Sequence, residues 1–384
     1  MKRVLRAVWT YLRTADMALL ALCLTASGYG LALIYSATRS YESERDILIQ
    51  GLALCLGLGL FFLFSLLDVD FFTDRWYLLL AFNLAMLLVL KLWGVEGGTG
   101  NRSWLRFSGV GIQPSEVVKV SFVLLLGRQM NRLRDTARGL SAVGSVAQLA
   151  LHFGLMFALI VVISADLGSA LVFLVIFAAM CFAGGLNLLW FLAALAALAA
   201  LAPLLWERFL SDYQRSRILA PYFPELVDPD GLGVTWQAGQ SKIALASGGL
   251  TGQGFLQGVK SQSDLLPYKH TDFIFAVAGE ELGLVGCLAV IALLTLIILR
   301  VIFVGLRSGS YRDMLICAGF AGMLTFQTFE NIGMCVGLTP VVGITLPFFS
   351  YGGSSLITCF AAMGVVSGIR RRTKSVQLSH WLSR

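Results

Sequence analysis

The chain has 384 residues, of which 57% are hydrophobic and only 13% are charged. Soluble globular proteins carry about 25% charged residues, so this composition excludes a soluble enzyme and indicates a polytopic membrane protein. The formal net charge of +7 does not indicate nucleic acid as a partner, because the basic residues are distributed among the loops between apolar segments.

Ten apolar runs follow one another along the chain, centred on residues 17–36, 47–67, 76–93, 114–129, 144–163, 168–184, 187–206, 283–305, 313–337 and 353–369. A helix that crosses a bilayer needs about 20 mainly apolar residues. We therefore expect an all-α polytopic membrane protein with about ten transmembrane helices, formed as a single domain by residues 1–384. A large extracytoplasmic loop, about 207–272, is expected between the seventh and eighth helices.

The basic residues predict the orientation of these helices. An even number of spans places both termini on one side, which then carries 17 Lys and Arg residues against 11 on the other. Because short cytoplasmic loops are enriched in Lys and Arg, both termini are predicted to be cytoplasmic. Residues 1–13 place three arginines at helical spacing between apolar side chains, which predicts a retained amphipathic helix on the inner leaflet.

Cysteine and histidine indicate neither disulfides nor zinc. The seven cysteines all lie inside apolar runs, none forms a CxxC pair, and the three histidines are scattered. The glycine cluster at 248–258 is not a nucleotide loop, because no Gly-Lys-Ser/Thr follows it. Its glycines either serve backbone geometry alone or place backbone amides at a diphosphate site.

Charged residues within apolar runs are costly to insert and mark either function or a paired structural site. Glu116 and Lys119 are three residues apart, so they share a helix face, either as a structural ion pair or as part of a site. Asp166 lies at the boundary before the sixth run, where it either caps the helix or serves the site.

Asp272 lies between two basic residues, Lys269 and His270, and the apolar run 273–276. A carboxylate at such a water boundary is partly desolvated yet accessible, which suits a general base. A helix-capping role for Asp272 is the alternative that composition alone leaves open.

Several motifs together resemble the SEDS family (shape, elongation, division and sporulation). They are HTDFIFA at 270–276, GEELG at 279–283, QSKIA at 240–244, SGGL at 247–250, QPSEVVK at 113–119, DLG at 166–168, NIGM at 331–334, TPVVG at 339–343 and LPFFSYGGSS at 346–355. The resemblance covers nearly the whole chain. Within the family, the 241–244 stretch and the short termini look most like the RodA type.

The resemblance implies an inverting peptidoglycan glycosyltransferase that polymerises lipid II into β-1,4 glycan strands at the outer face of the bacterial cytoplasmic membrane, for cell elongation and shape. It also implies a class B penicillin-binding protein, a transpeptidase, and other elongation-complex proteins as partners. A lipid II flippase, a divisome paralogue of the FtsW type and a sporulation paralogue remain alternatives.

The resemblance further implies which residues act. Asp272 is expected to be the catalytic base. Substrate contacts are expected from Lys119, Glu116, Arg102, Arg106, Lys242, Lys269, His270 and Ser354. A divalent cation, Mg²⁺ or Mn²⁺, is expected at the diphosphate with Asp166 and Glu116 as ligands, and no nucleotide is expected.

Overall fold

The computed structural model describes residues 9–40, 44–95, 102–107, 110–136 and 139–382. Each of the ten predicted runs contains a long helix: α2 (Met17–Arg39), α3 (Glu44–Leu66), α5 (Trp76–Trp93), α6 (Pro114–Arg134), α7 (Val143–Ser164), α8 (Leu167–Ala183), α9 (Leu188–Arg208), α13 (Ile274–Arg307), α14 (Tyr311–Val336) and α15 (Gly353–Leu382). The predicted all-α polytopic architecture is confirmed.

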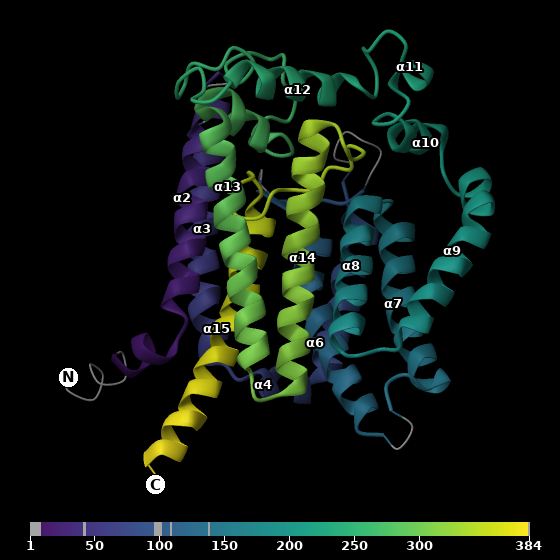
Figure 1. The fold of residues 1–384 in the computed structure, drawn as a ribbon, viewed down its shortest axis with the longest axis vertical. Coiled ribbons are helices and arrows are strands. Elements are labelled where there is room, and N and C mark those ends of the chain that lie inside the picture. The colour runs from purple at the N-terminus through teal and green to yellow at the C-terminus, as the bar shows by residue number, and fades with distance from the viewer. Residues whose placement is uncertain (1–8, 41–43, 96–101, 108–109, 137–138, 383–384) are drawn as a thin grey trace.

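Seven of these helices are long and apolar enough to cross a membrane. Among the other three, α8 is apolar but has only 17 residues, while α6 and α14 carry charged side chains within their apolar faces. The long helices stand side by side in one bundle, with α9 at its edge (Figure 1). The helices with the charged faces therefore lie inside the bundle, shielded from lipid by their more apolar neighbours.

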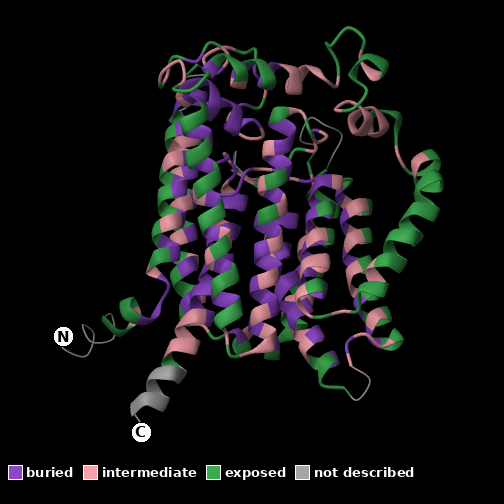
Figure 2. Cartoon of the chain, in the orientation of Figure 1, coloured by how far each residue is buried: buried purple, intermediate pink, exposed green. Residues whose placement is uncertain are grey.

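The centre and the edge of the bundle differ in burial (Figure 2). α15 is the most enclosed candidate span, with 83% of its apolar window buried, and it packs mainly against α3. α14 packs against α13 and α8. α9 has no buried residue and leans away from the bundle at its edge, so most of its surface is available to lipid.

The long loop lies at the end of the bundle opposite the start of α2 and the end of α15 (Figure 1). It contains α10 (Asp212–Leu219), α11 (Pro224–Val227) and α12 (Trp236–Gly248), and α12 lies across the helix ends. Two features were not predicted: the short helix α4 (Val69–Asp74) and an antiparallel hairpin of β1 (Leu105–Phe107) and β2 (Val110–Ile112) before α6. Of the predicted N-terminal amphipathic helix, residues 9–14 are helical and residues 1–8 lie outside the described part of the chain.

α13 is broken at Gly283, which has φ 66° and ψ −162°. The N–H groups of Leu284 and Val285 donate to the carbonyls of Gly249 and Leu250 in the long loop. A Cβ at Gly283 would lie 2.4 Å from the backbone nitrogen of Gly252, so only glycine fits the break. The loop is thereby anchored between a short buried helix, which follows Asp272, and the long apolar helix beyond Gly283.

At the opposite end, Asp16 connects three helices. Its carboxylate caps α2 by accepting the N–H of Leu19 at 3.1 Å. The same carboxylate binds Nε of Arg300 on α13 at 3.0 Å and the guanidinium of Arg370 on α15. Because the side chain of Asp16 is fully buried, these contacts supply the charge that its burial requires.

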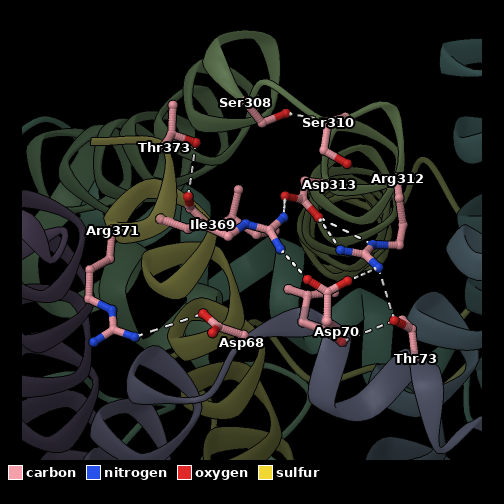
Figure 3. A network of polar contacts seen from close by, with 12 residues as sticks. Asp68, Asp70, Thr73, Ser308, Ser310, Arg312, Asp313, Ile369, Arg371 and Thr373 are labelled. Carbon is pink, nitrogen blue, oxygen red and sulfur yellow. Dashed lines mark hydrogen bonds and ion pairs between the residues drawn. The ribbon is translucent and has the colours of Figure 1, made fainter. Parts of the chain in front are cut away.

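The following two arginines of α15 bind acidic residues on other elements (Figure 3). Arg372 contacts Asp70 on α4, at 2.9 Å, and Asp313 on α14. Arg312 reaches the same Asp70 at 2.5 Å. Arg371 lies 3.9 Å from Asp68, the residue before α4. The three consecutive arginines of α15 therefore contact different neighbouring elements, and ion pairs connect the helices at this end of the bundle.

Candidate functional site

Glu116 and Lys119 lie in the first turns of α6, and Pro114 occupies the start of this helix, where a missing N–H costs little. Nζ of Lys119 is 2.6 Å from Oε1 of Glu116, and the two side chains are 1% and 8% exposed. The pairing expected from their spacing is therefore present. The ammonium group lies in the interior of the bundle with its charge balanced by one carboxylate.

Asp166 joins the starts of α6 and α8. Its Oδ1 accepts the N–H of Ser169 at 3.0 Å, so it caps α8, and its Oδ2 accepts Nε2 of Gln113 at 3.0 Å. The N–H of Gln113 in turn donates to Oγ of Ser354 at the start of α15. Gln113, Ser169, Asp166 and Ser354, which we call the interhelical cluster, therefore bring the beginnings of three helices together.

Asp272 lies just before α13 but does not cap it, because the N-cap residue is Phe273. The carboxylate instead points toward Gly343, where a Cβ would lie 3.5 Å from Oδ2. Burial raises the pKa of Asp272 to about 6, against the opposing effects of a hydrogen bond from Thr271 and the charge of Arg217. A carboxyl group with this pKa is poised to exchange a proton near neutral pH.

The segment around Gly343 separates Asp272 from the interhelical cluster. A Cβ on Gly168, at the start of α8, would lie 2.8 Å from the carbonyl oxygen of Val342 and 3.4 Å from Oδ1 of Asp166. Asp166 is also close enough to Asp272 to raise its pKa through charge repulsion. Two carboxylates thus lie on the two sides of one glycine-containing loop.

Lys269 and His270 precede Asp272 in the chain, but their side chains face other groups. Nζ of Lys269 is buried and donates to Oγ of Ser40 and to the carbonyls of Ser261 and Ser263, each at 2.8 Å. The ammonium group therefore holds the long loop together. The ring of His270 packs on that of Tyr351 with centroids 5.4 Å apart, and its burial lowers its pKa.

Glu280 and Glu281 explain the neighbouring glycine cluster. Both are fully buried. Glu280 accepts the N–H groups of Lys260 and Ser261 at 2.7 Å, and Glu281 accepts Oγ of Ser36 at 2.6 Å. Within the glycine cluster, the N–H of Leu256 donates to Oε2 of Glu281 at 3.2 Å, and a Cβ at Gly258 would lie 2.7 Å from Oε2 of Glu280. These close contacts support the backbone-geometry role of the glycines.

A pocket opens between the long loop and the end of α14. Its empty volume, which includes its open mouth, is about 450 Å³, and it is lined by Arg217, Ala220, Pro221, Pro224, Val234, Thr235, Ala238, Lys242, Gly337, Thr339 and Val341. Two of these residues, Arg217 and Lys242, carry positive charge. Val341, which lines the pocket, is two residues from Gly343, the residue that the Asp272 carboxylate faces, and the charge of Arg217 lowers the pKa of Asp272. The pocket therefore lies near the candidate base. Sequence reasoning found Lys242 but missed Arg217, which no local motif distinguishes from the other cations of the loop.

Arg102 and Arg106 are exposed on the hairpin segment before α6, with Arg106 opposite Gly111 in the register. Among the described residues, no three His, Cys, Asp or Glu side chains gather as metal ligands. Glu116 is engaged by Lys119. Asp166, by contrast, is 7% exposed, and its hydrogen-bond partners in the described chain are neutral. A buried carboxylate without a charged partner suits a divalent cation whose other ligands are phosphate oxygens.

The chain is similar to proteins of a known family. A family model described as "Cell cycle protein", for FtsW, RodA and SpoVE, matches residues 16–375. The peptidoglycan glycosyltransferase MrdB of Escherichia coli K12 is 37% identical over 286 residues, 73% of this chain and 74% of MrdB. A probable peptidoglycan glycosyltransferase FtsW of Geobacter sulfurreducens is 31% identical over 369 residues, 94% of this chain and 96% of the relative.

Two solved structures share the fold. One chain, from a structure described as "Structural coordination of polymerization and crosslinking by a peptidoglycan synthase complex", is 31% identical with a TM-score of 0.78, covering 94% of this chain and 98% of that chain. The rod shape determining protein RodA of Thermus thermophilus is 30% identical with a TM-score of 0.67, covering 93% and 97% respectively.

Proposed function

The chain belongs to the SEDS family of FtsW, RodA and SpoVE proteins and is a peptidoglycan glycosyltransferase, and we propose that Asp272 is the base of its reaction. The observation that carries this assignment is the position of the Asp272 carboxylate. It is partly buried, does not cap α13, and lies between a cationic pocket and the interhelical cluster.

The proposed reaction joins two lipid-linked sugars. Asp272 takes the proton of the acceptor's 4-hydroxyl group as that oxygen attacks the anomeric carbon of the donor. The bond from this carbon to the diphosphate breaks on the opposite side, and the diphosphate leaves with the electron pair. An α-linked donor thereby becomes a β-1,4 glycan, which is an inverting substitution that needs only one base.

The departing diphosphate carries negative charge, which preorganised cations stabilise. Arg217 and Lys242 face the pocket beside Asp272, and Lys119 is the buried cation at the start of α6. A divalent cation held by Asp166 would add further neutralisation of the phosphate oxygens when bound. All of these cations would thus stabilise the leaving group.

Lipid II is the proposed donor and acceptor, because lipid-linked sugars require a site at the headgroup level of a membrane protein. We propose that the long loop lies on the outer face and both termini in the cytoplasm, as the distribution of Lys and Arg predicts. The similarity to a synthase complex that couples polymerization and crosslinking supports a class B penicillin-binding protein as partner, with other elongation proteins. The similarity to a rod shape determining protein RodA supports the role in cell elongation and shape.

Purified chain supplied with lipid II tests the assignment. The wild-type protein should form glycan strands, and Asp272→Asn should reduce the rate by about 10²–10⁴-fold while remaining folded. Addition of a chelator tests the cation, and addition of the cognate transpeptidase tests the partner. A well-folded Asp272→Asn protein that polymerises at the wild-type rate would eliminate the base assignment.

A further inference from the structure

Hydrogen bonds connect the backbone of Asp272 and Thr271 to α14 and to the loop between α14 and α15. The carbonyl of Thr271 accepts a hydrogen bond from Oγ of Ser350 at 2.6 Å. The carbonyl of Asp272 accepts one from Nδ2 of Asn331 at 2.8 Å. Both donors lie on α14 or on the loop between α14 and α15, at least 59 residues from the base along the sequence.

Asn331 connects the backbone of Asp272 to the segment that the Asp272 carboxylate faces. Its Nδ2 also donates to the carbonyl of Ile344 at 2.7 Å, so both amide hydrogens are used. Ile344 follows Gly343, the residue that the Asp272 carboxylate faces. Asn331 is fully buried, and its Oδ1 has no partner among the described residues. The Asn331 amide therefore donates two hydrogen bonds and fixes the distance between the backbone at Asp272 and the backbone at Ile344.

Ser350 makes the second hydrogen bond to the backbone around Asp272. Its Oγ accepts a hydrogen bond from the N–H of Leu346 at 2.8 Å and donates one to the carbonyl of Thr271. The adjacent N–H of Tyr351 donates to the carbonyl of His270 at 2.8 Å. Three consecutive carbonyls, at residues 270, 271 and 272, are thus held by donors from α14 and the loop after it.

Such contacts bear on catalysis because a general base must lie within hydrogen-bond reach of the proton that it removes. The side chain of Asp272 has few rotatable bonds, so fixing its backbone also fixes its carboxylate. A displacement of about 1 Å at a reacting group can cost roughly 10²-fold in rate. Substrate binding, by contrast, uses the separate cationic groups of the pocket.

We propose that Asn331 and Ser350 are positioning residues for the transferase reaction, which hold the backbone of residues 271–272 so that the Asp272 carboxylate meets the acceptor hydroxyl. Neither residue contacts the substrate. The proposal rests on the assignment of Asp272 as the base. It assigns to the α14–α15 region a task that the charged residues of the site do not perform.

The test compares Asn331→Leu with a matched control, Gln327→Leu. Gln327 lies one turn earlier on α14 and is 1% exposed, and its amide atoms have no partner among the described residues. Asn331→Leu should lower kcat by about 10²-fold and leave KM for lipid II within about twofold. Gln327→Leu should keep the wild-type kcat. A purely structural effect on α14 would lower the yield of folded protein in both variants and leave the kcat of each folded fraction unchanged.

Ser350 provides a second comparison, which decides the matter if Asn331→Leu does not fold. Ser350→Ala removes the donor to Thr271 and should lower kcat, whereas Ser350→Thr retains a hydroxyl and should restore most of it. Equal rates for these two variants would overturn the proposal. So would a folded Asn331→Leu protein with wild-type kcat, a raised KM with unchanged kcat, or an equal loss of kcat in Gln327→Leu.

Asp272→Asn in the same assay separates this proposal from the one on which it rests. An inactive Asp272→Asn beside a fully active Asn331→Leu removes the positioning role and leaves the base assignment standing. An active Asp272→Asn removes both.

Discussion

Nζ of Lys119 lies 2.6 Å from Oε1 of Glu116, with both side chains buried at the start of α6. Removing one partner of a buried pair leaves an uncompensated charge and costs about 3–5 kcal/mol, whereas removing both is better tolerated. We therefore expect Glu116→Gln with Lys119→Met together to unfold at a higher temperature than either single variant.

The activity of the same double variant tests the role of Lys119. If its ammonium stabilises the departing diphosphate, the double variant should be folded but slower than wild type by 10-fold or more, since a charged hydrogen bond contributes about 1.5–3 kcal/mol. Thermal unfolding in detergent and polymerisation of lipid II are the two measurements. Wild-type activity in the double variant would show that the pair is structural only.

The cationic pocket gives the next prediction. Arg217→Ala or Lys242→Ala should slow polymerisation by roughly 10–100-fold, because each removes a charge-assisted contact to the leaving group. Arg208→Ala is the control, since Arg208 is an exposed cation at the end of α9 that does not line the pocket. Equal rates for the Arg217 and Arg208 variants would argue against a diphosphate in this pocket.

Much of the fold could be predicted from the sequence because its signals are local. The ten helices follow from the lengths of the apolar runs, and the pairing of Glu116 with Lys119 follows from their spacing on one helix face. The cap at Asp166 follows from its position directly before an apolar run. Each of these features depends on residues within a few positions of one another.

The rest depends on contacts between distant segments. The break in α13 at Gly283 exists because residues 249–252 approach it, and the apolar pattern of 283–305 gives no sign of it. One of the hydrogen bonds of Lys269 goes to Ser40, 229 residues away. Asn331 was recognised only as part of a motif, because its two carbonyl partners lie on other segments. Periodicity and composition carry no information about contacts between segments that are distant in the sequence.

The ion pairs around Asp16, at the end of the bundle opposite the long loop, predict a loss of stability when Asp16 is replaced. Asp16→Asn leaves Arg300 and Arg370 without their shared carboxylate, although both arginines are partly exposed and regain some hydration. We expect a loss of about 1–3 kcal/mol and a lower unfolding temperature. Asp212→Asn is the control, because its pair with Arg215 is exposed and such pairs contribute little. Indistinguishable unfolding temperatures would contradict the structural importance of Asp16.

The predicted orientation is tested by cysteine labelling. Asp264 is exposed in the long loop and Asp135 is exposed after α6, at opposite ends of the bundle. In intact cells, a membrane-impermeant maleimide should label Asp264→Cys and should leave Asp135→Cys unlabelled until the membrane is opened. The parent chain is the control, because six of its seven cysteines are buried and the exposed Cys55 lies within α3. The reverse pattern would place the site on the cytoplasmic side.

The pH dependence of the reaction follows from the pKa of Asp272. Burial raises this pKa from 3.8 to about 6, so the folded protein favours the protonated carboxyl below that pH. Only the deprotonated form can accept a proton, so kcat should fall about tenfold per pH unit on the acid side and level off above the pKa. Arg217 lowers the pKa of Asp272, so Arg217→Ala should move the acid limb of the profile to higher pH, whereas Arg208→Ala should leave it in place. A rate that stays constant from about pH 5 to about pH 7.5 would be incompatible with Asp272 as the base.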